Sequence, residues 1–332
     1  MNLMRASWML AVPAVLLGLR LVFGCSTSSH HGGDDDAAAD DDQGDDAADD
    51  DAGDDAADDD TNPPPPGCTT LHQGLNENFM VDGKAREFYI DLPDGVADSW
   101  PWPSIFSWHG TGDTAANWRW VFTHGDQVNN ATMPFIGVTP ETNYASVFGW
   151  DIVNGTEPNE DVDLFDAVLA EINTCWGVDR DRVYSMGHSF GGAMSDLLGV
   201  LRGDQIASLG THSGVYACDP ANGLVSTLGN WPPLTTANKY AQLLVHGSQT
   251  GDIMVILNFY YFNLNDQAWL NGLGHDVVIC NHGLTHNDWP SSFDTPQYVE
   301  FFHDHPLGTT HSPYAGGLPS DYPSYCQYSP AQ

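Results

Sequence analysis

The stretch Arg182-Val-Tyr-Ser-Met-Gly-His-Ser-Phe-Gly-Gly-Ala-Met194 decides the fold of this chain. Residues 183–186 predict a short buried strand, and the apolar residues from 192 to 201 recur at helical spacing. Between them, Gly187-His188-Ser189-Phe190-Gly191 matches G-x-S-x-G, a pattern that places a serine on a sharp turn between a strand and a helix. The two glycines relieve collisions that this turn would otherwise cause. We therefore expect an exposed Ser189 hydroxyl that faces the free N–H groups of the helix.

Short apolar runs alternate with helical patterns along the rest of the chain. The runs that predict strands are residues 88–93, 104–108, 134–138, 183–186, 241–245 and 277–280, and the spacing of residues 160–175 predicts a helix. This alternation indicates an α/β fold, with a mainly parallel sheet covered by helices on both faces. Functional groups on such sheets lie at the carboxyl ends of the strands, and here polar clusters follow several strands directly.

Two of these clusters contain the groups that a serine nucleophile needs. A serine hydroxyl attacks poorly unless an imidazole accepts its proton and a carboxylate orients that imidazole. Asp252 follows the strand at 241–245, and His286 follows the strand at 277–280. Because strand–serine–helix folds of this kind carry the serine, the acid and the histidine in that chain order, the pattern predicts Ser189, Asp252 and His286 as a catalytic triad.

Other acids compete with Asp252 for this role. Asp219 follows a weaker strand pattern, Asp266 lies in an aromatic run with helical character, and Asp276 precedes the strand at 277–280, at the opposite edge of the sheet. A solvated surface aspartate is the alternative interpretation of Asp252 itself.

His282 competes with His286, and the H-x-x-x-H spacing of the two is that of some metal sites. The glutamate of an H-E-x-x-H helix is absent and a glycine lies between the histidines, so we expect no metal site. We expect His275 and His311 at the surface or in structural roles, and His303-Asp304-His305 as a solvated cluster at a helix end.

Hydrolysis through a serine also needs donors for the oxyanion of the tetrahedral intermediate. We expect one donor to be the backbone N–H of Phe190, directly after the nucleophile. The loop His109-Gly110-Thr111-Gly112, after the strand at 104–108, would supply the second, for which the N–H of Thr111 is the first choice.

Several further motifs occur together over about residues 80–310. They are His109-Gly110, Asp161-Val-Asp-Leu-Phe165, Val178-Asp-Arg-Asp-Arg-Val-Tyr184, Gly187-His-Ser189, the His246-Gly247 to Asp252 loop and Gly283-Leu-Thr-His-Asn-Asp-Trp-Pro290. Together they resemble the polyhydroxybutyrate depolymerase and feruloyl esterase group of secreted α/β-hydrolases. The resemblance implies a serine esterase without a cofactor, with nucleophile, acid and base at Ser189, Asp252 and His286. It allows a small ester, a feruloylated polysaccharide or a polyester as substrate. The chain departs from the group at Phe190, where a small or polar residue is usual.

Two other functions are compatible with the same residues. A catalytically inactive hydrolase domain could serve as a surface binding module, although such a module has no need of all three triad residues. A serine peptidase of the same fold is the second alternative.

Residues 1–25 predict an export leader. An apolar run at 6–19 follows Arg5 and is too short for a confident membrane span. Leu21-Val-Phe-Gly-Cys25 resembles a bacterial lipobox, in which Cys25 would carry lipid. We therefore expect an exported protein, lipid-anchored at the cell surface or in the periplasm. An ordinary secretory signal that releases a soluble protein is the alternative.

Residues 26–67 predict a disordered tether between this leader and a catalytic domain at 68–332. Residues 34–60 contain 16 aspartates and no apolar residue larger than alanine, and a proline run follows at 63–66. Such a segment cannot bury enough surface to fold. It lacks the spaced ligands and turn glycine of a calcium-binding loop, so we do not expect it to bind calcium.

The chain is strongly acidic, with 45 acidic and nine basic residues and a formal charge of −36. Without the 16 tether aspartates and the two leader arginines, 29 acidic and seven basic residues still leave about −22. This charge argues against nucleic acid as a partner and against electrostatic binding to membranes, which leaves a lipid anchor as the only expected membrane contact.

Six cysteines occur in the chain. If Cys25 carries lipid, five remain, and an oxidising compartment then favours two disulfides and one free thiol whose pairing the sequence leaves open. These are Cys68, Cys175, Cys218, Cys280 and Cys326. No C-x-x-C motif is present, so neither a thiolate zinc site nor a redox motif is expected.

Overall fold

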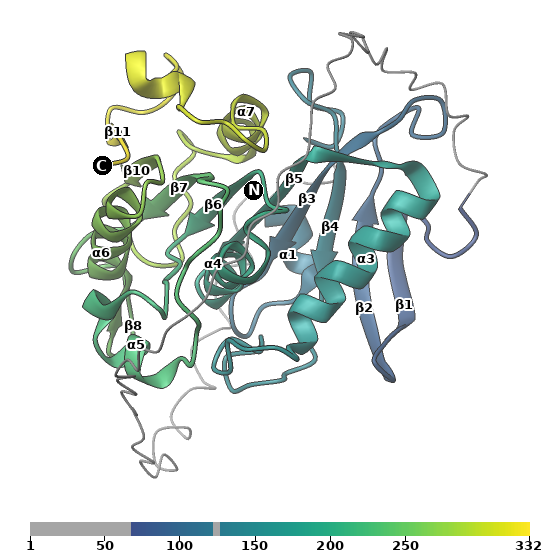
Figure 1. Ribbon diagram of the computed structural model, residues 1–332, viewed down its shortest axis with the longest axis horizontal. Coiled ribbons are helices and arrows are strands. Elements are labelled where there is room, and N and C mark those ends of the chain that lie inside the picture. Colours follow the sequence, from purple (N-terminus) through teal and green to yellow (C-terminus); the bar gives the residue numbers. More distant parts are fainter. Residues whose placement is uncertain (1–67, 122–126) are drawn as a thin grey trace, which may run out of the picture. The chain divides into compact units, whose positions relative to one another are not determined.

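The computed structural model describes residues 68–121 and 127–332 (Figure 1). The predictions for the leader, for Cys25 and for the tether lie outside these residues. In the described part no helix is both long and apolar enough to cross a lipid bilayer.

The described residues form a nine-stranded sheet in the order β1-β2-β4-β3-β5-β6-β7-β10-β11. The strands are β1 (Gly74–Val81), β2 (Lys84–Asp91), β3 (Trp102–Trp108), β4 (Ile136–Pro140), β5 (Val178–His188), β6 (Ser208–His212), β7 (Ala241–His246), β10 (Val277–Asn281) and β11 (Cys326–Ser329). Strands β4 to β10 of this order run parallel, whereas β1, β2 and β11 add antiparallel edges. The predicted mainly parallel sheet is thus confirmed.

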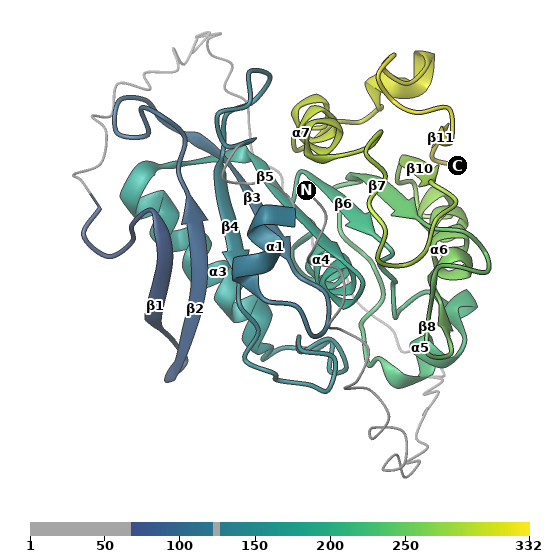
Figure 2. The ribbon, with the colours of Figure 1, turned by 180° about the vertical axis from the view of Figure 1, so that it is seen from behind.

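Helices cover both faces of the sheet, and each face has its own apolar core (Figures 1 and 2). Helices α3 (Glu160–Trp176), α4 (Phe190–Arg202) and α6 (Phe259–Gly272) pack on one face, and α1 (Ala115–Val121) and α7 (Thr295–Asp304) on the other. The connections contain α5 (Leu224–Leu228), the 3₁₀ turns η2 (Pro220–Asn222) and η3 (Pro313–Gly316), and the hairpin β8 (Ile253–Met254) with β9 (Leu257–Asn258).

The sequence patterns missed three strands of the large sheet, and in each case tertiary pairing explains the miss. β6, Ser-Leu-Gly-Thr-His, has little apolar character, yet all five residues are buried because β5 and β7 flank it. β1 and β11 lie at the two edges of the sheet, and most of their residues are only partly buried or exposed. The patterns predicted no strand after residues 277–280, whereas in the structure β11 follows and pairs with β10.

A buried ion pair joins β2 to the start of α3. Arg86 donates from Nη2 to Oδ1 of Asp161 at 2.5 Å and from Nη1 to the carbonyl of Glu160 at 2.7 Å. The other carboxylate oxygen of Asp161 accepts the backbone N–H of Asp151 at 2.6 Å. The side chains of Arg86 and Asp161 are 1% and 0% exposed, so each charge depends on the other for its compensation.

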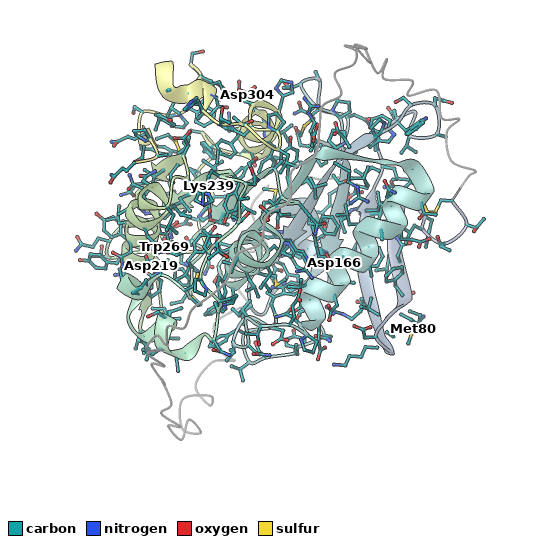
Figure 3. All side chains as sticks on the ribbon, in the orientation of Figure 1. Met80, Asp166, Asp219, Lys239, Trp269 and Asp304 are labelled. Carbon is teal, nitrogen blue, oxygen red and sulfur yellow. A yellow bond between two sulfur atoms is a disulfide. The ribbon has the colours of Figure 1, made fainter. Side chains whose placement is uncertain are left out.

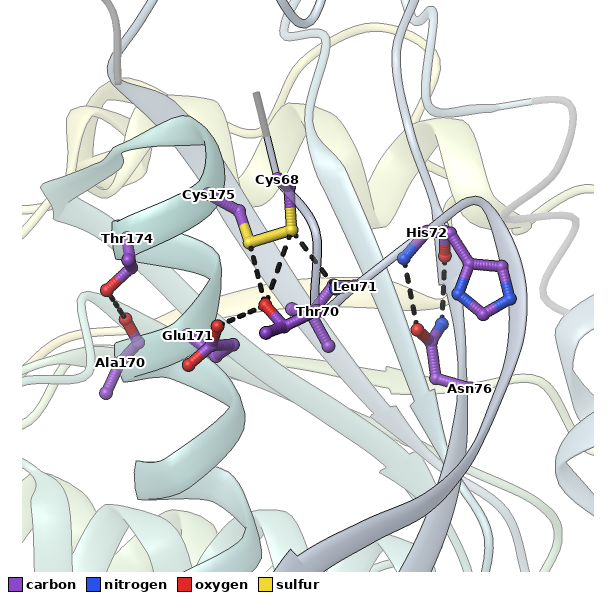
Figure 4. The surroundings of a disulfide bond; sticks show 9 residues. All are labelled: Cys68, Thr70, Leu71, His72, Asn76, Ala170, Glu171, Thr174 and Cys175. Carbon is purple, nitrogen blue, oxygen red and sulfur yellow. Dashed lines mark hydrogen bonds between the residues drawn. A yellow bond between two sulfur atoms is a disulfide. The ribbon is translucent and has the colours of Figure 1, made fainter. Parts of the chain in front are cut away.

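Two disulfides and one free thiol are present among the described cysteines, which agrees with the expectation from the sequence. Cys68–Cys175 links the segment before β1 to the last turn of α3, where Thr70 also donates to Glu171 (Figure 4). Cys280–Cys326 joins directly opposed residues of β10 and β11. Cys218 is free. Disulfides of this kind persist in oxidising compartments.

We predict that Arg86→Met destabilises the fold by ~3–5 kcal/mol, because it leaves the Asp161 carboxylate buried without its partner. Urea unfolding followed by circular dichroism measures this change. Arg180→Met, which replaces an exposed arginine, is the control and should leave the urea midpoint unchanged. An Arg86→Met midpoint equal to that of the control would contradict the role given to this pair.

Candidate active site

The predicted strand–serine–helix turn lies between β5 and α4. Ser189 has φ 56° and ψ −124°, a left-handed conformation that is strained for a residue with a side chain. A Cβ on Gly187 would lie 2.3 Å from the carbonyl oxygen of Gly191, and one on Gly191 would lie 2.1 Å from that of Trp108. Only glycine fits at either position. The expected exposure of Ser189 is wrong, since the residue is only 6% exposed.

The structure brings Ser189, His286 and Asp252 together at the carboxyl ends of the parallel strands. Oγ of Ser189 lies 2.9 Å from Nε2 of His286, and Nδ1 of His286 lies 2.6 Å from Oδ1 of Asp252. A carboxylate can only accept, so Nδ1 carries the proton and Nε2 is free to accept the serine proton. All three side chains are buried.

Asp252 is held as a carboxylate by several donors. Its Oδ2 accepts the hydroxyl of Ser213 at 2.9 Å and the backbone N–H of Gly247 at 2.8 Å. Burial opposes the charge of Asp252, but the hydrogen bond and charge of His286, with the donors Gly247 and Ser213, hold the pKa of this carboxyl below its ordinary value. Asp252 therefore stays ionised at neutral pH and can orient the imidazole.

The competing acids occupy structural positions. Asp219 caps η2 by accepting the N–H of Ala221. Asp266 accepts from the side chain of Asn222 at 2.7 Å, and Asp276 accepts the N–H of Ser312 at 2.9 Å.

His282 also lies apart from the serine. Its Nδ1 accepts the N–H of Leu284 at 3.2 Å, and its Nε2 lies 3.1 Å from Nε2 of His212. Among residues 68–121 and 127–332, no group of three or more His, Cys, Asp or Glu side chains is placed to hold a metal ion.

The expectation that residues 303–305 form a solvated cluster is wrong in part. His303 is partly exposed and pairs with Asp304, but His305 is fully buried. Its ring nitrogens contact the carbonyl of Phe301 at 2.7 Å and the hydroxyl of Ser312 at 2.7 Å. The segment that contains η3 covers this helix end, a contact between distant residues that no local pattern reveals.

The two segments predicted to supply the oxyanion donors lie beside Ser189. Phe190 is the first residue of α4, so its N–H has no partner within the helix. A Cβ on Gly110 would lie 3.5 Å from Cβ of Ser189, which places the 109–112 loop against the serine. The hydroxyl of Thr111 donates to the carbonyl of Phe148 at 2.5 Å and so connects this loop to the loop between β4 and α3.

Several residues around the triad were not identified from the sequence. Ser213 lies one residue beyond β6, a strand that the pattern also missed, and its positive φ of 53° marks a second sharp turn. Phe259 begins α6, and its ring centroid lies 4.5 Å from that of His286. Phe190 packs at 4.3 Å against Phe148, and both are partly exposed, so an aromatic surface borders the serine.

A cavity of about 450 Å³ lies between α6 and the loop after β6, and no triad residue lines it. Its lining includes Trp231, Trp269 (labelled in Figure 3) and the free thiol of Cys218. Burial raises the pKa of this thiol to about 12. Cys218 is therefore a thiol rather than a thiolate at neutral pH and is no rival nucleophile to Ser189.

Two buried acids lie against the backbone segment that follows Ser213. A Cβ on Gly214 would lie 2.6 Å from Oδ2 of Asp196, and Asp266 accepts the N–H of Tyr216 at 3.3 Å. Burial raises the pKa of Asp196 to about 8, and burial together with the charge of Asp196 raises that of Asp266 well above its ordinary value. Both side chains are thus protonated at neutral pH.

We predict that Asp196 makes the folded state less stable as the pH rises from about 4 to 8. In this window the unfolded chain releases the proton, whereas the folded chain retains it until its higher pKa is reached. Asp196→Asn should flatten the pH dependence and raise the urea midpoint at pH 8 relative to the wild type. Urea unfolding at pH 5 and pH 8 measures both effects. Asp98→Asn at an exposed site is the control, and identical slopes in both variants would contradict the prediction.

The described residues thus form an α/β-hydrolase fold, with a serine–histidine–aspartate arrangement at the carboxyl edge of the sheet. The structure reported as native sOPH superimposes with a TM-score of 0.62 at 19% identity, covering 80% of this chain and 96% of that one. An S-formylglutathione hydrolase from Agrobacterium tumefaciens gives 0.50 at 14% identity, covering 70% and 95%. These likenesses confirm the predicted fold.

Curated relatives confirm the resemblance to feruloyl esterases. Feruloyl esterase D of Neurospora crassa is 28% identical over 172 residues, which are 48% of this chain and 57% of the relative. Feruloyl esterase C of Emericella nidulans is 29% identical over 177 residues, 49% and 59% of the two chains. The chain thus spans less than two thirds of the length of these relatives. No family model matches it.

Proposed function

We propose that this protein is a carboxylic-ester hydrolase that acts through an acyl-enzyme on Ser189. The observation that carries the proposal is the continuous hydrogen-bond chain from Oγ of Ser189 through His286 to Asp252, with contacts of 2.9 and 2.6 Å. The similarity to feruloyl esterases supports the choice of an ester as substrate.

In the first step, Nε2 of His286 accepts the proton of Ser189 while Oγ attacks the carbonyl carbon of the ester. The negative charge that develops on the carbonyl oxygen is stabilised by the N–H groups of Phe190 and Thr111. Asp252 stays ionised and stabilises the imidazolium through its bond to Nδ1.

The tetrahedral intermediate then collapses, and His286 returns the proton to the alcohol oxygen as the ester bond breaks. The acyl group remains on Ser189. A water molecule next gives its proton to His286 and attacks the acyl carbonyl, which releases the carboxylic acid and restores the serine hydroxyl. No step requires a cofactor.

A feruloyl ester is the substrate that the relatives favour among the small esters, feruloylated polysaccharides and polyesters allowed by the sequence. The partly exposed rings of Phe148 and Phe190 support this choice, because a flat aromatic acyl group can stack on them.

The proposal also includes export. Residues 1–25 would serve as a leader with lipid on Cys25, residues 26–67 as a tether and residues 68–332 as the catalytic domain. The two disulfides support an oxidising location, and a lipid on Cys25 would be the only contact with a membrane. Release as a soluble secreted protein is the alternative, and labelling with a radioactive fatty acid separates the two.

We predict that Ser189→Ala lowers kcat for an ester substrate by about 10⁴-fold or more, because it removes the nucleophile. Methyl ferulate, p-nitrophenyl acetate, a hydroxybutyrate oligomer and a peptide anilide form the substrate panel. Ser226→Ala, in α5 outside the site, should retain full activity. Faster turnover of the anilide would identify a peptidase. A folded wild type that forms no fluorophosphonate adduct at Ser189 would indicate an inactive binding module.

We predict that Asp252→Asn lowers kcat by about 10³- to 10⁴-fold. The asparagine amide can donate to Nδ1 of His286, which favours the tautomer with the proton on Nε2 and prevents this atom from accepting from Ser189. Steady-state kinetics with methyl ferulate measures the loss. An unchanged kcat would assign the third triad position to a different acid.

A further inference from the structure

We propose that His188, the residue directly before the nucleophile, is a positioning residue for the catalytic base. This inference rests on the proposed function. Nε2 of His188 lies 2.8 Å from the backbone carbonyl oxygen of His286. Because a carbonyl only accepts, Nε2 of His188 carries the proton and donates it, and Nδ1 is unprotonated.

The bond matters because His286 lies outside any helix or strand, in the loop between β10 and α7. Four hydrogen bonds hold the residue. Its ring binds Asp252 and Ser189, its N–H donates to the carbonyl of Gly251 at 3.1 Å, and its carbonyl accepts from His188. Two consecutive residues of the strained turn therefore hold the base, one through its ring and the other through its backbone.

Neighbouring rings fix the orientation of the His188 imidazole. The indole of Trp118 stacks on it at 5.8 Å and 20°, and Trp289 meets it edge-on at 5.9 Å. The ring of His212 lies at 5.3 Å. A Cβ on Gly110 would lie 3.1 Å from Nδ1, so the loop predicted to stabilise the oxyanion lies directly beside this ring nitrogen.

His188 stays neutral throughout catalysis. Burial, followed by the charge that His286 acquires, lowers the pKa of His188 to about 3. The imidazolium that forms on His286 during turnover thus meets an uncharged donor. The bond to the carbonyl of His286 remains in place while the proton passes from Ser189 to the base and back.

A loss of this bond should slow the chemical step and leave substrate binding intact. A displacement of about 1 Å in a catalytic group can cost about 100-fold in rate. His188 is 8% exposed, and it contacts the backbone carbonyl of His286 rather than the atoms that transfer the proton. The expected signature is a lower kcat at constant KM.

Three variants test the proposal. Glutamine can place its amide nitrogen where Nε2 of histidine lies, whereas asparagine, one methylene shorter, places it near Nδ1. His188→Gln should keep kcat for methyl ferulate within about threefold of wild type. His188→Asn, and His188→Phe, which retains the ring packing, should lose about 10- to 100-fold in kcat with KM unchanged.

The proposal would be overturned if His188→Asn and His188→Phe kept the wild-type kcat. It would also be overturned if His188→Gln and His188→Asn lost equal amounts of kcat. Thermal unfolding of each variant separates a loss of positioning from a loss of fold. A wild type without esterase activity would refute the proposed function instead. In that case NMR tests the positioning role through the low-field resonance of the proton on Nδ1 of His286. This resonance should persist in the wild type and in His188→Gln. It should shift or disappear in His188→Asn and His188→Phe. Persistence in all four proteins would refute the role of His188.

Discussion

The close approach of Gly191 to the backbone of Trp108 is the constraint on which the site depends. A Cβ on Gly191 would collide with the carbonyls of both Trp108 and His109, so the start of α4 can approach β3 only because glycine stands there. This approach permits the left-handed conformation of Ser189 and places its Oγ above the sheet. It also brings the 109–112 loop against the serine, so one packing constraint determines the position of the nucleophile and of an oxyanion loop.

The other members of the site converge because parallel strands end at a common edge. Asp252 and His286 follow β7 and β10, which pair directly, and β6 brings Ser213 beside Asp252. These loops contain little regular secondary structure, and hydrogen bonds between them hold their residues in place. The base is held at both backbone polar groups and both ring nitrogens, which limits the displacement it can undergo during proton transfer.

The buried aspartates near the triad differ in their charge states. Asp252 keeps its negative charge because three groups, His286, Gly247 and Ser213, compensate its burial. Asp196 and Asp266 accept hydrogen bonds but have no positively charged partner, so burial raises the pKa of each carboxyl and both retain their protons. The site thus contains one ionised carboxylate opposite the imidazole, and the neutral acids beneath it add no competing negative charge.

The α/β alternation, the glycine turn around Ser189 and the order of serine, acid and histidine could all be predicted from the sequence. These features are local, because apolar periodicity and the absence of a Cβ act within a few residues. Tertiary packing alone produced the burial of β6, the hydrogen bond from Ser213 to Asp252, the pairing of the cysteines and the contact of His188 with the carbonyl of His286. These depend on residues that are roughly 25 to 110 positions apart, whose proximity arises from strand pairing and loop packing rather than from any local pattern.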